Sequence, residues 1–139
     1  MKKYLFLVVA LGLMANVYGQ VAQASSEKAS GPVITFEKST HDFGDMYQGD
    51  KAEHTYKFTN TGNDALVITN VQVTCGCTTP QGWPREPIAP GGKGEITIGF
   101  NSAGKMGKQN KVVTIVSNAV NTDGSQISFT TNVLDKKPQ

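Results

Sequence analysis

The sequence is poor in the residues and motifs that usually carry chemistry. Its 139 residues include two cysteines, two histidines and one tryptophan. It contains no GxSxG nucleophile motif, no phosphate-binding glycine loop and no HExxH metal-binding motif. The commonest hydrolase, nucleotide-binding and zinc-protease signatures are therefore excluded. We expect a protein that is not an enzyme and that has no cofactor and no resident metal.

Long apolar segments are restricted to the N-terminus. Two lysines precede the apolar run YLFLVVALGLMA, and small-residue cleavage sites follow at Gly19 and Ala24. This is the layout of a secretory signal peptide. A membrane anchor needs roughly 18 or more apolar residues in succession. We therefore expect residues 1–24 to be a cleaved signal peptide, the mature chain to have no membrane span, and the protein to be secreted or periplasmic.

Net charge is also low in the expected mature chain. The full sequence has 13 basic and 11 acidic residues, and removal of Lys2 and Lys3 leaves 11 of each. No basic cluster remains, which argues against nucleic-acid binding by a surface that tracks phosphates. A mature chain of about 115 residues is long enough for one hydrophobic core but not for two. We expect one domain and a monomer.

The sequence beyond the signal peptide divides into a lead-in and a domain. Residues 25–32 are small and polar, which is typical of a flexible segment. Residues 33–135 form short runs of β-type sequence between Gly, Asn and Asp turns, with no convincing amphipathic helix. About seven such runs predict an all-β fold, an immunoglobulin-like β-sandwich.

Side-chain alternation predicts which residues face the core. His54, Tyr56 and Phe58 share one face of a half-buried strand. Thr131 shares the apolar face of a later strand, where a β-branched residue is readily accepted. The alternation of apolar and polar residues changes phase near Asn70. This change predicts a β-bulge there, which would turn the following side chains to the other face of the strand.

Turn signals mark the boundaries between the expected strands. Pro90-Gly91 suits the centre of a type II turn. Residues 101–109 and 118–126 are typical of hairpin loops. Asp42 and Asp45 flank Gly44, and we interpret them as turn residues and not as a catalytic acid–base pair. His41, beside Asp42, is interpreted as a hydrogen-bonded structural residue.

Several groups of residues occur together in a specific order: His41-Asp42-Phe43-Gly44, Phe58 with Asn60-Thr61-Gly62, Cys75-Gly76-Cys77-Thr78, Pro90-Gly91, and Gly107 before Lys111 and Ser117-Asn118. In this combination the chain resembles the DUF1573 family of exported bacterial proteins over residues 33 to about 134. The resemblance implies an immunoglobulin-like fold akin to the ASPM/SPD-2/Hydin and major sperm protein types. It implies no reaction.

Cys75 and Cys77 lie one residue apart at the end of an apolar strand. Residues two apart in an extended segment point to the same face, so the two sulfurs are natural neighbours. An even cysteine count in an exported protein favours a disulfide. Extended Cα atoms two residues apart lie about 6.5–7 Å from each other, at the upper limit for a disulfide, so a bend at Gly76 is expected.

Two other interpretations of the cysteine pair remain open. Adjacent thiolates suit a soft ion such as Cu(I), with Met46 or Met106 adding a thioether and a histidine an imidazole if folding brings them close. A thiol-redox site is the related alternative. The remaining possibility is a pair of half-buried thiols that only pack.

The segment TTPQGWPREPIAP, residues 78–90, is predicted to be a loop stiffened by four prolines. Trp83 and Arg85 belong to the residue types that dominate binding hot spots, so this loop is the candidate partner-binding surface. The alternative is that Trp83 folds back and covers one end of the core.

The sequence thus predicts an exported, non-catalytic β-sandwich that acts by binding or by structural support. Its expected partner is an unknown protein or another envelope component. The main alternative is a copper-binding or thiol-redox accessory protein that uses Cys75 and Cys77.

Overall fold

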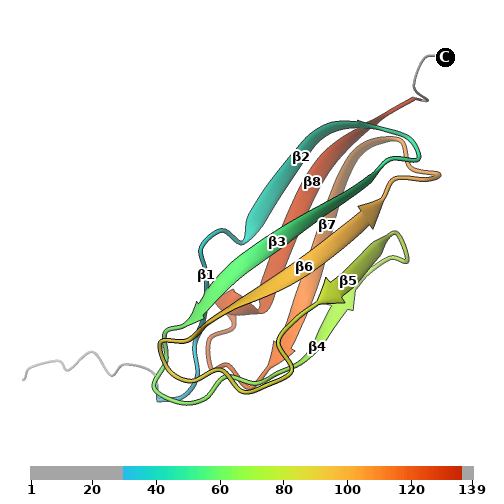
Figure 1. The fold of residues 1–139 in the computed structure, drawn as a ribbon. Coiled ribbons are helices and arrows are strands. Elements are labelled where there is room, and N and C mark those ends of the chain that lie inside the picture. The colour runs from blue at the N-terminus through green and yellow to red at the C-terminus, as the bar shows by residue number, and fades with distance from the viewer. Residues whose placement is uncertain (1–29, 136–139) are drawn as a thin grey trace, which may run out of the picture.

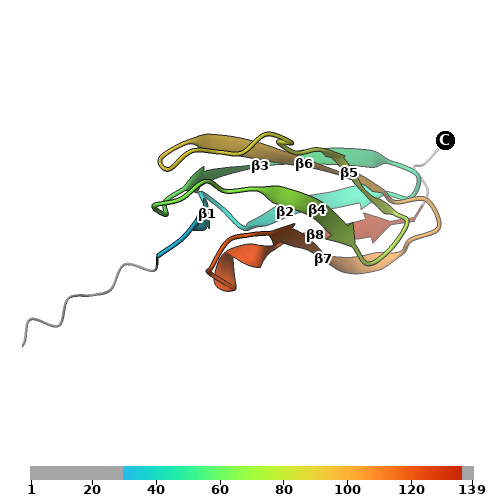
Figure 2. The ribbon, with the colours of Figure 1, turned by 90° about the horizontal axis from the view of Figure 1, so that it is seen from below.

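The computed structural model describes residues 30–135, which form two four-stranded β-sheets packed face to face (Figure 1). One sheet has the strand order β1-β3-β6-β5 and the other the order β2-β8-β7-β4. Figure 2 shows the two layers from a second direction. The strands are β1 (Ile34–Phe36), β2 (Thr40–Tyr47), β3 (Lys51–Asn60), β4 (Ile68–Val73), β5 (Thr78–Gly82), β6 (Lys93–Asn101), β7 (Gly107–Ser117) and β8 (Gln126–Leu134).

This architecture confirms the all-β, two-sheet prediction. The expected signal peptide lies outside the described residues, as does most of the expected lead-in. Eight strands are present where about seven were predicted. A single 3₁₀ turn, η1 (Asp123–Ser125), is the one helical element among the described residues.

The core lies between the two sheets and follows the predicted alternation. Tyr56 and Phe58 on β3 are each 1 % exposed, and His54 on the same face is half-buried. Thr131 on β8 is 3 % exposed, as predicted for its phase. Its hydroxyl donates to the carbonyl oxygen of Gly44 on β2 at 2.8 Å, which satisfies a polar group inside the sandwich.

Strand β5 was not predicted, because its sequence contains Pro80. It forms the edge of its sheet and pairs with β6, with a register shift between Pro80 and Gly82. Proline is tolerated on an edge strand because its missing N–H is not needed by a further neighbour. The expected Pro-rich loop is therefore shorter at its N-terminal end than residues 78–90.

The two predicted hairpins have different outcomes. Residues 118–126 do connect two antiparallel neighbours, β7 and β8. Residues 101–109 do not form a hairpin, because β6 and β7 belong to different sheets. The hydroxyl of buried Ser102 donates to the carbonyls of Tyr47 and Asp50, so the crossing segment is tied to the β2–β3 turn. Turn composition alone does not distinguish a hairpin from a crossing between sheets.

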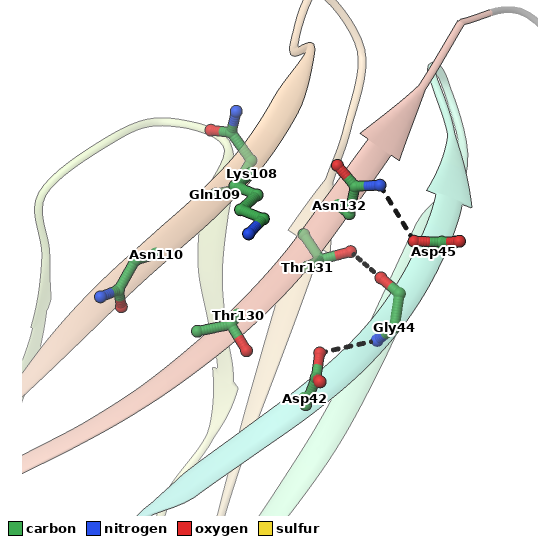
Figure 3. Close-up of a pocket in the computed structure, with 9 residues that line it drawn as sticks. All are labelled: Asp42, Gly44, Asp45, Lys108, Gln109, Asn110, Thr130, Thr131 and Asn132. Carbon is green, nitrogen blue, oxygen red and sulfur yellow. Dashed lines mark hydrogen bonds between the residues drawn. The ribbon is translucent and has the colours of Figure 1, made fainter.

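Two bulges interrupt the sheet β2-β8-β7-β4. The first lies between Ile68 and Asn70 on β4, which confirms the predicted slip. The second lies between Asp42 and Asp45 on β2, where a turn was expected (Figure 3). That expectation was wrong because glycine and aspartate favour both turns and bulges; Gly44 has φ +69° within the strand.

The predicted type II turn is present. Gly91 has φ +80°, and the N–H of Gly92 donates to the carbonyl of Ala89 at 2.8 Å. These are the marks of a type II turn with glycine at its third position.

Candidate functional site

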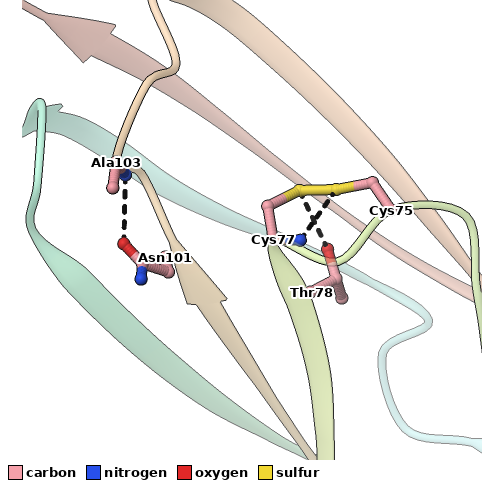
Figure 4. Close-up of a disulfide and its surroundings, with 5 residues drawn as sticks. All are labelled: Cys75, Cys77, Thr78, Asn101 and Ala103. Carbon is pink, nitrogen blue, oxygen red and sulfur yellow. Dashed lines mark hydrogen bonds between the residues drawn. A yellow bond between two sulfur atoms is a disulfide. The ribbon is translucent and has the colours of Figure 1, made fainter.

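Cys75 and Cys77 form a disulfide at the corner where the chain leaves β4 for β5 (Figure 4). Strands β4 and β5 are edge strands of different sheets. The carbonyl of Cys77 accepts from the N–H of Asn101 on β6 at 2.8 Å, and the Cys77 side chain packs against the core. The disulfide therefore stabilises the segment that joins the edges of the two sheets.

The backbone at the disulfide is bent, as predicted. The Cα atoms of Cys75 and Cys77 are 5.3 Å apart, and the N–H of Thr78 donates to the carbonyl of Cys75 at 3.2 Å. Glycine is not required for this bend. Gly76 does not have a positive φ, and a Cβ built on it would meet nothing within 4 Å. The turn itself brings the two sulfurs together.

Trp83 and Arg85 lie together beyond β5. The central guanidinium carbon of Arg85 is 3.8 Å from the centroid of the Trp83 ring, in a cation–π contact. Trp83 is half-buried and packs against the core, whereas Arg85 is exposed. The indole Nε1 is buried and has no hydrogen-bond partner among the described residues. The ring thus covers part of the core and presents its remaining surface beneath Arg85.

We call Trp83 and Arg85 the Trp83 corner; the Cys75–Cys77 disulfide lies at the other end of β5. In the disulfide form the two sulfurs offer no thiolate, which the Cu(I) hypothesis requires. Within residues 30–135 no three His, Cys, Asp or Glu side chains are grouped so as to hold a metal ion. Met46 is buried at 8 % exposure, Met106 is exposed in a loop, and the two histidines stack on each other.

The fold and the site together define the class of domain: a two-sheet β-sandwich with a disulfide at the junction of two edge strands. The chain belongs to the DUF1573 family, described as proteins of unknown function, whose profile matches residues 34–133. No curated protein matches the sequence. No helix within residues 30–135 is long and apolar enough to cross a membrane.

Solved structures with the same architecture differ widely in sequence. A protein of unknown function from Porphyromonas gingivalis W83 is 18 % identical with a TM-score of 0.63, over 76 % of this chain and 48 % of that one. The secreted serine protease VesC from Vibrio cholerae is also 18 % identical, with a TM-score of 0.58 over 76 % of this chain and 24 % of that one. The ASH/PapD-like domain 7 of human CEP192 is 10 % identical, with a TM-score of 0.54 over 75 % of this chain and 87 % of that one.

These similarities concern the fold. The chain spans about half the length of the Porphyromonas gingivalis protein and about a quarter of VesC. In those two structures the matching β-sandwich accounts for only part of the chain.

Proposed function

We propose that this protein is exported and acts as a non-catalytic binding module, and that the Trp83 corner contacts another protein of the cell envelope. The observation that carries the proposal is the exposed guanidinium of Arg85 lying on the half-buried ring of Trp83. Tryptophan and arginine are the residue types most enriched where interfaces gain their binding energy.

The corner has the rigidity that favours binding. Pro84 and Pro87 restrict the backbone on either side of Arg85, and the Trp83 ring is packed against the core. A surface that is already ordered loses less conformational entropy when a partner docks. Arg85 also covers the ring in the free protein, which limits the exposure of an aromatic surface to water.

Export is supported by the N-terminal sequence and by the disulfide. A charged n-region, an apolar run and small-residue cleavage sites are the features of a signal peptide. Disulfides persist in oxidising compartments outside the cytoplasm. A similar sandwich occurs within VesC, which is a secreted protein.

The thiol-redox alternative has one observation in its favour. Cys75 and Cys77 are both partly accessible, so an external thiol has a path to the bond. This alternative predicts that a glutathione buffer set to the redox potential of an oxidising compartment reduces a measurable fraction of the disulfide. The binding proposal predicts that the bond stays closed under the same conditions.

The experiment has two parts. Fractionation of cells and intact mass of the recovered protein test export: a mass lacking residues 1–19 or 1–24, found outside the cytoplasm, is expected. The purified domain and its Trp83→Ala and Arg85→Glu variants are then immobilised and exposed to envelope extract. A partner retained by the wild type and by Lys57→Glu, a control on the outer face of β3, but lost with both corner variants supports the proposal. Equal retention by all four proteins contradicts it.

A further inference from the structure

The outer faces of the two sheets differ in chemistry. The face of β3 and β6 carries a mixture of opposite charges: Lys51, Glu53, Lys57, Lys93 and Glu95. The outer face of β2, β8 and β7 is dominated by amides and hydroxyls, such as Asn110, Ser128, Thr130 and Asn132. A mixed-charge face is typical of a surface that meets only solvent. The amide-rich face therefore calls for a separate explanation.

The bulge in β2 places two carboxylates on this face. Residues three apart in a regular strand point to opposite faces. Asp42 pairs with Thr130 and Asp45 with Asn132, so three steps along β2 match two along β8. The extra residue turns Asp45 to the same side as Asp42, and Figure 3 shows the two carboxylates on β2 on either side of Gly44.

The bulge is held in place from inside the sandwich. The hydroxyl of buried Thr131 donates to the carbonyl oxygen of Gly44 at 2.8 Å, and the N–H of Gly44 donates to Oδ1 of Asp42 at 2.9 Å. Oδ1 of Asp45 accepts from Nδ2 of Asn132 at 3.0 Å. The second oxygen of each carboxylate has no hydrogen-bond partner among the described residues. Two acceptors are thus fixed in position and left available.

These side chains line a hollow of about 380 Å³, with Lys108 and Asn110 contributed by β7. That volume falls within the range of about 300–1,000 Å³ that is usual for small-ligand sites. The hollow offers carboxylate acceptors, carboxamides that both donate and accept, a hydroxyl and one ammonium donor. It has no aliphatic or aromatic side chain in its lining.

We propose that this hollow, formed by Asp42, Asp45, Lys108, Asn110, Thr130 and Asn132, binds a neutral oligosaccharide. A sugar presents neighbouring hydroxyls that each donate and accept, which matches a lining of mixed acceptors and donors. Two carboxylates against one ammonium disfavour an anionic ligand, and the absence of a large apolar side chain from the lining disfavours a lipid or an apolar peptide. The site lies on a surface different from the Trp83 corner and does not depend on that proposal.

The test is a set of ¹H–¹⁵N NMR titrations of the mature protein with maltopentaose, cellopentaose, laminaripentaose and chitopentaose, each to millimolar concentration. At least one sugar is expected to shift amide resonances of residues 42–45, 108–110 and 130–132. The Asp42→Asn/Asp45→Asn variant keeps the side-chain shape and should weaken that binding about tenfold or more, which corresponds to about 1.4 kcal/mol. The Glu53→Gln/Glu95→Gln variant on the opposite face is the matched control and should bind like the wild type.

Three results would overturn the proposal. One is the absence of a shift in these residues with every sugar. Another is a response to calcium chloride or pentalysine in place of the sugars, which would make the hollow a cation site. The third is an equal loss of binding in the control variant. If the Asp42→Asn/Asp45→Asn protein does not fold, Asn110→Ala provides the same comparison, because Asn110 makes no hydrogen bond through its side chain in the described structure.

Discussion

The imidazole rings of His41 and His54 are stacked, with centroids 3.6 Å apart and planes within 7° of parallel. His41 lies on β2 and His54 on β3, so the pair joins the two sheets. The ring of Phe43 is nearly perpendicular to that of His41, and the ring of Tyr56 is nearly perpendicular to that of His54, each at a centroid distance of 4.7 Å. The stack is therefore part of an aromatic cluster between the sheets.

Acid should destabilise the fold through His54. Burial, the charge of His41 and the charge of Lys38 lower the pKa of His54 below its ordinary value of 6.5. The unfolded chain therefore binds a proton more readily than the folded one, and the free energy of unfolding falls as pH drops below 6.5. We expect a lower urea midpoint at about pH 5 than at about pH 7, and a smaller difference in His54→Gln.

The charged groups near His54 define the control for this prediction. Glu37, Lys38 and Lys57 line the same surface hollow as His54. Lys38→Gln removes one of the charges that lower its pKa while keeping the stack, so its acid response should lie between those of the wild type and His54→Gln. If all three proteins lose the same stability on acidification, the stack has no role in the pH dependence.

Asn60 should be among the residues most sensitive to substitution. It is fully buried, and its amide donates to the carbonyls of Asp64 and Ile88 while its oxygen accepts from the N–H of Gly62. Asn60→Ala leaves the carbonyl of Asp64 and the N–H of Gly62 without these partners, whereas the carbonyl of Ile88 still accepts from the N–H of Leu66. At about 1–3 kcal/mol for each unsatisfied group, we expect a total loss of at least about 2 kcal/mol in chemical unfolding. Asn110 is exposed and its side chain makes no hydrogen bond in the described structure, so Asn110→Ala should change stability by less than about 0.5 kcal/mol. A comparable loss in the two variants would contradict this expectation.

Gly62 and Gly76 should respond differently to alanine. A Cβ on Gly62 would collide with the carbonyl oxygen of Gly31 and the amide nitrogen of Val33, whereas one on Gly76 meets nothing within 4 Å. Gly76→Ala should keep the disulfide and a wild-type melting temperature. Gly62→Ala should lower the melting temperature by several degrees, since a loss of about 1 kcal/mol shifts it by about 4–8 °C in a domain of this size. A large effect at Gly76 would show that the turn depends on glycine.

The disulfide should contribute little to global stability. It closes a minimal loop, and loop-entropy estimates for such a short closure give about 1–2 kcal/mol. Cys75→Ser with Cys77→Ser should therefore fold, with NMR shifts concentrated in residues 73–83. Single Cys75→Ser, which leaves a free thiol at Cys77, is the control for the effect of the serine itself. Failure of the double variant to fold would make the bond a structural requirement.

The sequence predicted well which residues face the core, because side chains alternate between the two faces of a strand and this alternation is a local property of the chain. Tyr56, Phe58 and Thr131 all lie on the predicted side. The β4 slip was also predictable, because a bulge changes the apolar phase near Asn70. The bend at the cysteines followed from the distance that a disulfide allows between Cα atoms.

Features set by partners distant in sequence were not predictable in this way. Pro80 is tolerated in β5 because β5 lies at the edge of its sheet. This edge position is known only from the order of the strands in the sheet. The crossing after β6 and the contact of Arg85 with Trp83 also depend on tertiary placement. The polar hollow combines a bulge on β2 with outward residues of β7 and β8, and no local pattern links Asp45 to Asn132.

The most direct test of the central claim is photo-crosslinking in living cells. A photoreactive phenylalanine analogue is placed at Arg85, which is exposed in the Trp83 corner, and separately at Lys57, which is exposed on the outer face of β3. If the Trp83 corner binds an envelope protein, we expect a discrete adduct with one such protein from position 85 and none from position 57. Adducts of equal yield from both positions, or no adduct from position 85, would contradict it.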